Sequence, residues 1–437
     1  MKITPKMYRV LSMIALPLAS LYLMWRSRRQ PEYRQFWDER FAWSSFPLKT
    51  HRPRVWIHAV SVGETNAARP ILESILKTWP ECDVLLTHMT PTGREAGKAL
   101  VALAPDRIVQ TYLPYDAPYA VRKFFRQTRP TIGLIMETEV WPNLMSEAQN
   151  MGIPMILANA RESEKSREKA AKVIELMRPA FESFEVVLAQ SEEDKRRFES
   201  LGAKRVLVCG SVKFDIRPNL SQVAAARDWK QRLRRPVILL ASTRSGEERQ
   251  FALALSEKKE LCRRAQIVVV PRHPERFEEV YDLFSSLGFN VKKRSQLRDA
   301  ADIANDVDVV IGDSMGEMSF YCALADMVAM GGSFEPFGCQ NVIEPAMAGS
   351  PVVVGPSIFN FDKIVHDGCQ AGAMVQVKTA QEALEQFAHW IDYPMERVMA
   401  SEAALKFSAT YAGATARMMV ELEAIWNKAQ KNASSMP

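Results

Sequence analysis

Residues 331–356 read GGSFEPFGCQNVIEPAMAGSPVVVGP, and this stretch decides the fold class. It lies between two apolar runs, 327–330 and 351–354, which predict buried strands. Its glycines let the backbone approach a ligand closely, because glycine has no Cβ. Asn341 can cap a helix over 342–348, with Glu344 in the first turn, where the helix dipole favours a carboxylate. A loop that joins a strand to a helix in this way is where parallel sheets bind ligands, although the spacing also fits an ordinary capped turn.

The same alternation of short apolar and longer amphipathic runs fills two blocks of the chain. The runs that predict strands are 55–60, 83–87, 108–113, 131–136, 154–158, 185–189 and 205–208, then 237–241, 266–270, 289–292, 307–311, 327–330, 351–354 and 373–377. Amphipathic stretches such as 65–77 and 191–201 predict the helices between them, which is the pattern of parallel α/β sheets. A polar linker at 215–222 separates the blocks, and 437 residues are long for one core. We therefore predict two α/β domains, 31–217 and 218–437, with a cleft between them and a long helix over 400–428.

The N-terminus predicts a membrane anchor over residues 1–30. Residues 10–25 carry no charge, and basic residues flank them: Lys2, Lys6, Arg9, Arg26, Arg28 and Arg29. The run is shorter than the roughly 20 residues of a spanning helix and contains Pro17, so a spanning and an interfacial anchor both remain open. It lacks a small-residue cleavage site, which disfavours a signal peptide, and a buried core helix is the remaining alternative to an anchor. The basic residues that follow it predict that the body stays on the cytoplasmic side.

The net charge indicates the kind of partner, and the cysteine content indicates the redox state of the protein. The net charge of +6 and a pI near 8.9 suit an anionic membrane surface or a phosphorylated substrate. No nucleic-acid-binding motif accompanies this charge, so we predict no nucleic-acid partner. The six cysteines form no CxxC pair, which is typical of a reduced protein without a disulfide framework or a zinc site.

Charged residues follow three predicted strands of the first domain. Glu64 follows the strand 55–60 and can act as a general base, but with Ser61 it also has the S-x-x-E spacing of a capping box. Glu137 and Glu139 follow the strand 131–136, and one of them can hold a hydroxyl or tune a neighbouring acid. Lys213 follows the strand 205–208, where a cation can stabilise a phosphate or developing charge. For Glu137, Glu139 and Lys213, ordinary solvated surface charges are the alternative.

Polar residues also follow strands of the second domain. Arg272 ends the strand 266–270 and has the planar fork that matches phosphate. Residues 312–317, GDSMGE, predict free backbone amides at a helix start, which suits an anion or nucleotide, although they match neither GxGxxG nor a P-loop. Asp306 and Asp308 have the D-x-D spacing of metal-dependent sugar transferases. They precede their strand, at the wrong edge of the sheet, so we predict no metal site there.

Together these motifs resemble the Kdo (3-deoxy-D-manno-octulosonic acid) transferase family. The resemblance lies in SVGET at 61–65, MTPTG at 89–93, LPYD at 113–116, METEVWPNL at 136–144, GSVKFD at 210–215, VPRHPERF at 270–277 and GDSMGE at 312–317. It extends from the N-terminal anchor almost to the C-terminus. It implies two Rossmann-like domains facing a cleft, the B-type glycosyltransferase fold. The first would be the acceptor domain and the second the CMP-Kdo (donor) domain.

The resemblance also implies an activity and the residues that perform it. The donor would be CMP-Kdo and the acceptor a lipid A precursor (lipid IVA) of lipopolysaccharide biosynthesis at the inner membrane, with inversion and without a cofactor or metal. Glu64 would be the base, with Glu137 and Lys213 as transition-state stabilisers. The implied CMP-binding residues are Pro271, Arg272, Met315, Gly316, Glu317, Asn341, Val342, Ile343 and Glu344. The chain departs from the family pattern at Arg244, where His is usual, and at Cys339–Gln340, where Gly-His is usual, which leaves donor affinity open.

Three other functions compete with this one. A UDP-sugar-dependent lipid glycosyltransferase would keep the fold and change the donor. A catalytically inactive membrane-anchored binding protein would fit the two departures. A nucleotide-linked oxidoreductase is disfavoured because no GxGxxG follows the strand 55–60.

Overall fold

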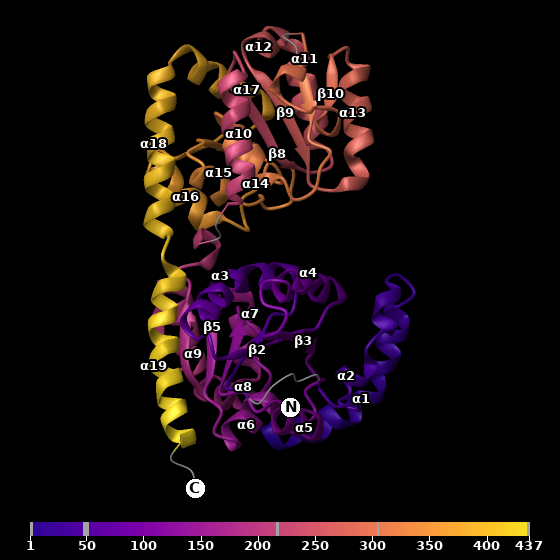
Figure 1. Ribbon diagram of the computed structural model, residues 1–437, viewed down its shortest axis with the longest axis vertical. Coiled ribbons are helices and arrows are strands. Elements are labelled where there is room, and N and C mark those ends of the chain that lie inside the picture. The colour runs from indigo at the N-terminus through magenta and orange to yellow at the C-terminus, as the bar shows by residue number, and fades with distance from the viewer. Residues whose placement is uncertain (1–2, 47–51, 216–217, 304–305, 435–437) are drawn as a thin grey trace. The chain divides into compact units, whose positions relative to one another are not determined.

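The structure, a computed structural model, describes residues 3–46, 52–215, 218–303 and 306–434. The chain forms two compact units: unit 1 comprises Met1–Ile216 and Ala412–Pro437, and unit 2 comprises Arg217–Tyr411 (Figure 1). The domain boundary predicted after residue 217, and residues 1–2 of the predicted anchor, lie outside the described residues.

Unit 1 is built on a seven-stranded, fully parallel sheet. Its strands, in spatial order, are β3 (Ile108–Tyr112), β2 (Asp83–His88), β1 (Arg54–His58), β4 (Ile132–Met136), β5 (Met155–Ala160), β6 (Phe184–Ala189) and β7 (Val206–Val208). The chain runs outward from β1 to β3, then returns to β1's other side with β4. The order therefore reverses between β1 and β4, and such a switch point is where open parallel sheets bind ligands.

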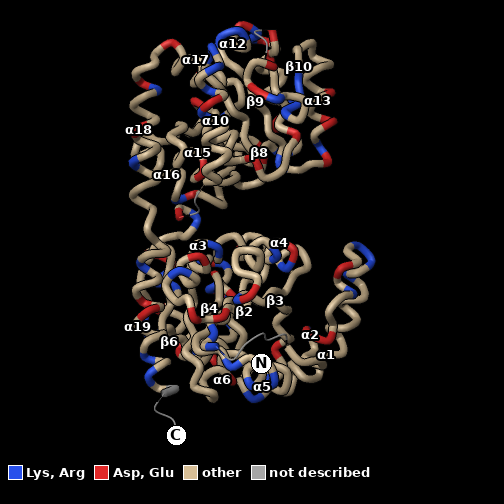
Figure 2. The backbone as a smooth tube through the Cα atoms, viewed as in Figure 1, with Lys and Arg blue, Asp and Glu red and all other residues tan. Residues whose placement is uncertain are grey.

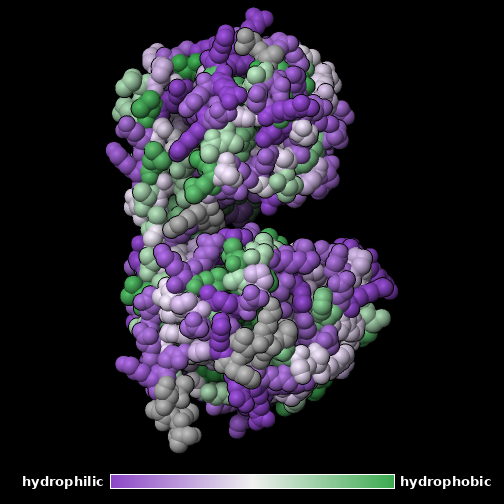
Figure 3. Space-filling view, viewed as in Figure 1, coloured by the Kyte–Doolittle hydropathy of each residue, from purple (hydrophilic) through white to green (hydrophobic). Residues whose placement is uncertain are grey.

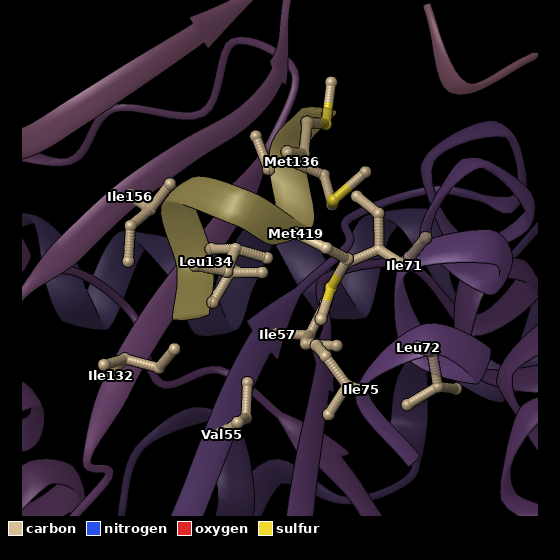
Figure 4. Close-up of a cluster of buried hydrophobic side chains, with 14 of the residues drawn as sticks. Val55, Ile57, Ile71, Leu72, Ile75, Ile132, Leu134, Met136, Ile156 and Met419 are labelled. Atoms are coloured by element: carbon tan, nitrogen blue, oxygen red, sulfur yellow. The ribbon is translucent and has the colours of Figure 1, made fainter. Parts of the chain in front are cut away.

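Helices cover both faces of this sheet, as buried parallel strands require. They are α2 (Trp37–Arg40), α3 (Val62–Thr78), α4 (Pro91–Val101), α5 (Pro118–Thr128), α6 (Pro142–Asn150), α7 (Glu164–Lys172), α8 (Ile174–Glu182), α9 (Glu192–Leu201) and α19 (Ala414–Ser434), with 3-10 turns η1 (Pro31–Arg34) and η2 (Val212–Asp215). One buried cluster joins the sheet to α3 and α19, and a second joins it to α5, α6 and α9. Met419 of α19 lies among Ile57, Ile71 and Leu134 in the first cluster (Figure 4).

The C-terminal helix corrects two predictions. The helix predicted over 400–428 is two helices, α18 (Pro394–Tyr411) and α19, because Gly413 between them adopts φ +87°. The prediction placed residues 218–437 in one domain, whereas Ala412–Pro437 belong to unit 1. The reason is hydrophobic: Met418, Leu422 and Trp426 pack on the unit 1 sheet, and Trp426 stacks on Trp79 with ring centroids 4.5 Å apart.

Unit 2 repeats the architecture with a second parallel sheet. Its strands, in spatial order, are β10 (Val291–Lys293), β11 (Val309–Ile311), β9 (Gln266–Pro271), β8 (Val237–Thr243), β12 (Met327–Met330), β13 (Val352–Val354) and β14 (Met374–Gln376). Its helices are α10 (Leu220–Arg232), α11 (Glu247–Glu257), α12 (Lys259–Arg264), α13 (Phe277–Ser286), α14 (Met318–Leu324), α15 (Ile343–Met347), α16 (Asp362–Gln370), α17 (Ala380–Asp392) and α18, with 3-10 turns η3 (Pro274–Arg276), η4 (Arg294–Gln296) and η5 (Ala300–Asp302). The switch point of this sheet lies between β8 and β12. All fourteen predicted strands are confirmed, with ends that differ by a few residues.

The predicted anchor forms one helix, α1 (Pro5–Arg26), which is long and apolar enough to cross a membrane. Its middle is uncharged, and basic residues gather at its C-terminal end (Figure 2). Exposed apolar side chains, including Ile14, Leu18 and Leu21, lie along it, and pale and green side chains cover this region in Figure 3. Leu23, by contrast, is buried against Tyr33 and other aromatic residues of unit 1.

Polar contacts also hold α1 against the rest of unit 1. Tyr8 donates to Asp116 at 3.1 Å, Arg9 donates to Glu147 at 2.9 Å, and the Asn143 amide donates to the Ser12 hydroxyl at 3.0 Å. The N-terminal half of the helix is therefore tied to buried or nearly buried polar groups of the unit. A helix that lies at the membrane surface can keep these hydrogen bonds, because its N-terminal half stays in contact with the protein.

Candidate active site

Glu64 and Glu137 both lie at the switch point of the unit 1 sheet. In the β1–β4 pair, His58 is opposite Ile135, so the residues that leave both strands emerge side by side. Glu64 lies in the first turn of α3, after β1, and Glu137 directly follows β4. The negative charge of Glu137 contributes to raising the pKa of the Glu64 carboxyl.

The Glu64 carboxylate is held on both oxygens. The Val60 amide donates to Oε2 at 2.8 Å, and the Ser61 hydroxyl donates to Oε1 at 2.9 Å. Ser61 caps α3, but Glu64 reaches the amide of Val60 and not that of Ser61, so the predicted capping box forms only in part. Burial raises the pKa of Glu64 to about 7; these two hydrogen bonds oppose the rise, and the negative charges of Glu137 and Glu139 add to it.

The segment after β4 is strained where the carboxylates lie. Glu137 adopts φ +61°, a left-handed conformation that is uncommon for a residue with a side chain, and its amide donates to the Ala158 carbonyl at 3.0 Å. Glu139 accepts from the Trp141 indole at 2.8 Å, and burial raises its pKa. Strain of this kind is typical of positions that the surrounding structure holds for a function.

Lys213 lies in η2, which packs against α3, the helix that carries Glu64. Its neighbours in the GSVKFD motif position this turn. The Val212 amide donates to the Asn159 side chain at 3.2 Å, and Asp215 accepts from the amides of Gly413 and Thr415 at the start of α19. Asp215 is thus a helix-capping residue, and the motif joins the lysine turn to the C-terminal helix.

Unit 2 contains a pocket of about 250 Å³ at the switch point of its sheet. Its lining residues lie at or after the carboxyl ends of β8, β9, β11 and β12: Ser242, Val270, Pro271, Arg272, Ser314, Met315, Gly316, Glu317, Met318, Tyr321, Cys322, Met330, Gln340, Asn341, Glu344 and Pro345. Gly331 allows the loops to approach, because a Cβ there would collide with the backbone of Ser242. The pocket therefore brings together three motifs that are far apart in the sequence.

The charged groups of this pocket hold one another in place. Asn341 donates to Glu344 at 2.9 Å, and burial raises the pKa of Glu344, while this hydrogen bond and the charge of Arg272 oppose the rise. Glu317 accepts from the Ser314 hydroxyl and pairs with Arg294 at 3.4 Å. Arg272 is fixed through its backbone, which donates to the Thr243 carbonyl at 3.0 Å.

Seven of the nine residues named for CMP binding line the pocket, and two do not. Val342 and Ile343 are fully buried among core residues, so their side chains serve packing. Asp308 precedes β11 and accepts from the Asn290 amide at 2.9 Å, away from the carboxyl ends of the strands. Sequence reasoning missed Ser242 and Tyr321; the i, i+4 spacing from Glu317 could have placed Tyr321 on the same face.

The two departures from the family pattern both lie beside this pocket. Gln340 lines it, and Cys339 is buried with φ +71°, a conformation that glycine adopts more easily. Arg244 donates to the His273 Nε2 atom at 2.9 Å, and its guanidinium lies 4.4 Å from the centroid of the Phe337 ring.

A parallel sheet with two carboxylates at its switch point, and a second parallel sheet with a polar pocket at its own, form two Rossmann-like domains, the architecture of B-type glycosyltransferases. The fold alone does not decide the activity, because a UDP-GlcNAc 2-epimerase from Neisseria meningitidis is similar in structure, with a TM-score of 0.57 and 17% identity over 84% of this chain and 98% of that one. Residues 35–216 match the family model described as 3-deoxy-D-manno-octulosonic-acid transferase (kdotransferase), and residues 288–407 match glycosyl transferases group 1.

The chain belongs to the 3-deoxy-D-manno-octulosonic acid transferase family. It is 40% identical to the protein of that name from Bordetella pertussis, over 93% of this chain and 96% of the relative. It is 31% identical to the Haemophilus influenzae protein of the same name, over 87% of this chain and 88% of the relative. The predicted family and glycosyltransferase class are thereby confirmed.

Proposed function

We propose that this enzyme transfers Kdo from CMP-Kdo to a lipid A precursor, lipid IVA, in lipopolysaccharide biosynthesis, with inversion at the anomeric carbon. Unit 1 supplies the general base, Glu64, and unit 2 binds the cytidine nucleotide. The observation that carries the proposal is the state of Glu64. Its pKa of about 7 lets it accept a proton near neutral pH, and its fixed orientation leaves little reorganisation for the reaction.

In the proposed reaction, an acceptor hydroxyl gives its proton to Glu64 as its oxygen attacks the anomeric carbon of Kdo. The bond from that carbon to the CMP phosphate breaks, and CMP leaves with the electron pair. A single displacement of this kind inverts the centre. Glu137 positions the acceptor and stabilises the positive charge that develops on the sugar, and Lys213 and Arg272 stabilise the negative charge of the phosphate, the role that a metal has in other transferases.

In this proposal the pocket of unit 2 holds the nucleotide. Arg272 meets the phosphate, and the backbone of Met315 and Gly316 lies against the nucleoside. Asn341 and Glu344 offer a hydrogen-bonded amide and carboxyl that suit the polar edge of a cytosine or the hydroxyls of a ribose.

The proposed location is the inner membrane, with α1 as the N-terminal anchor and both units on the cytoplasmic side. The exposed apolar side chains of α1 bury in lipid, and Arg26, Arg28 and Arg29 meet anionic headgroups. This brings the enzyme to an acceptor that is itself embedded in lipid.

The experiment is a transfer assay with purified full-length protein, CMP-Kdo and lipid IVA in detergent. We expect Kdo addition by the wild type and a loss of about 10²–10⁴-fold in kcat for Glu64→Ala, with Glu73→Ala, an exposed carboxylate on the same helix, as the control. Wild-type activity in Glu64→Ala would reject the assignment of the base.

Nucleotide binding and turnover distinguish the proposed function from its two alternatives. A UDP-sugar-dependent enzyme would be protected from thermal unfolding by UDP and not by CMP, and an inactive binding protein would bind CMP-Kdo without turnover. The proposal expects protection by CMP and multiple turnovers.

A further inference from the structure

We infer that Arg244, held by His273 and Phe337, forms a subsite beside the nucleotide pocket that binds the carboxylate of the donor sugar. The inference rests on the proposed function. The family pattern usually has histidine at this position, and the inference gives the arginine found here a part in recognising an anionic sugar.

The position of Arg244 follows from two strands whose carboxyl ends line the pocket. Ser242 at the end of β8 and Arg272 after β9 both line the pocket, and Arg244 and His273 follow them on the same two loops. The Arg272 amide donates to the Thr243 carbonyl at 3.0 Å, which ties the loops together. The Arg244–His273 pair therefore stands next to the pocket and not inside it.

Three contacts fix the Arg244 side chain and its backbone. The guanidinium donates to His273 Nε2 at 2.9 Å and lies 4.4 Å from the Phe337 ring centroid. The Arg244 amide donates to the buried carboxylate of Glu247 at 2.7 Å. A guanidinium has no acceptor, so His273 must accept at Nε2 and carry its proton on Nδ1. The arginine is thus oriented before a ligand arrives, which reduces the entropy lost on binding.

The lining of the pocket carries little net positive charge for a donor with two anionic groups. The pocket lining contains two carboxylates, Glu317 and Glu344, and one guanidinium, Arg272. Arg294 pairs with Glu317, and the charge of Arg272 already acts on Glu344. A donor that carries both a phosphate and a carboxylate would find too little positive charge in the lining alone.

Arg244 is the group that can supply this charge. Within the described parts of the chain, its guanidinium has no carboxylate within ion-pair distance, and His273 occupies only one of its five N–H donors. The planar fork of arginine matches a carboxylate with two parallel hydrogen bonds. Arg272 in the pocket then binds the phosphate, with Lys213 as proposed above, and Arg244 beside the pocket binds the sugar carboxylate.

The test separates the nucleotide from the sugar acid. We expect Arg244→Ala to raise the KM for CMP-Kdo at least about 10-fold while the Ki of CMP as a competitive inhibitor stays within about 2-fold, because a lost bidentate pair is worth about one factor of ten or more. Arg272→Ala should weaken both ligands. Arg244→Lys, which keeps the charge without the fork, should fall between the wild type and Arg244→Ala. Arg249→Ala, an exposed arginine on α11, is the matched control and should change neither constant.

Equal weakening of CMP and CMP-Kdo by Arg244→Ala, or an unchanged KM for CMP-Kdo, would overturn the inference. Denaturation of each variant by urea shows whether an effect on both ligands comes from misfolding, in which case Arg244→Lys decides. Should the wild type bind no cytidine nucleotide, the proposed function fails and takes the subsite with it. Should the wild type bind both ligands and Arg244→Ala lose neither, only the subsite fails.

Discussion

The free energy of unfolding of the wild type should fall as pH rises, and Glu64→Gln should abolish this pH dependence. Burial raises the pKa of Glu64 from 4.5 to about 7 in the folded protein. Between these values the folded state holds a proton that the unfolded state has lost, so stability falls as pH rises from about 4.5 to about 7 and is constant above.

The size of this effect follows from the shift. A difference of about 2.5 pH units at 1.36 kcal/mol per unit gives about 3.4 kcal/mol, and partial exposure of the carboxylate reduces it to about 1–3 kcal/mol. The amide of the substituted side chain has no charge to gain in this range. The free energy of unfolding of Glu64→Gln relative to the wild type should therefore rise by about 1–3 kcal/mol between pH 4.5 and pH 8.

The assay is urea denaturation of the full-length protein, with the transition of unit 1 followed by hydrogen exchange in α3 and β1. Glu73→Gln, on the exposed face of the same helix, is the control and should show the pH dependence of the wild type. If Glu64→Gln also follows the wild type at every pH, the carboxyl of Glu64 is not titrating near 7 and the reasoning from burial is refuted.

Three further predictions concern other parts of the chain. Asp215→Ala should lower the free energy of unfolding by about 1–2 kcal/mol in urea, because it removes the cap of α19, and Asp215→Asn should lose less; equal stability of all three proteins would reject the cap. Arg272→Ala should weaken CMP binding at least about 10-fold by calorimetry, because it removes a charged hydrogen bond to phosphate, whereas unchanged affinity would remove CMP from this pocket. The double substitution Leu18→Glu and Leu21→Glu should move the protein from sedimenting liposomes of anionic lipid to the supernatant, because both leucines are exposed and apolar. The control is Leu220→Glu, which changes an exposed leucine of unit 2 and should leave liposome binding unchanged. Continued co-sedimentation of the double variant would reject α1 as the anchor.

The strands were predictable because each one is buried on both faces, which leaves an uninterrupted apolar run in the sequence. The C-terminal boundary of unit 2, at Tyr411, was not predictable. The break at Gly413 is one glycine within a helical pattern, and the return of α19 to unit 1 depends on Asp215 and Met419, whose partners are about 200 residues or more away. Periodicity records which face of a helix is apolar and not which core that face joins.

The sequence predicted where the candidate sites lie but not how their side chains are bonded. Strand ends located Glu64, Arg272 and the 312–317 loop, because parallel strands present their carboxyl ends at one edge. The spacing could not decide whether Glu64 caps its helix or reacts. The structure shows it bonded to Val60 and Ser61 and buried enough to titrate near neutrality, so its contacts at the helix start are compatible with the proposed role as a base. The Arg244–His273 contact joins residues 29 positions apart and leaves no pattern in the sequence.

The pH dependence of kcat/KM for Kdo transfer tests the central claim, that Glu64 is the general base, most directly. For the wild type we predict a rise of tenfold per pH unit up to about pH 7 and a plateau above it, because only the ionised carboxylate accepts the proton. For Glu64→Gln we predict rates about 10²–10⁴-fold lower on the plateau and no rise through this range, with CMP affinity unchanged. A Glu64→Gln enzyme that keeps the wild-type rise and plateau would contradict the account.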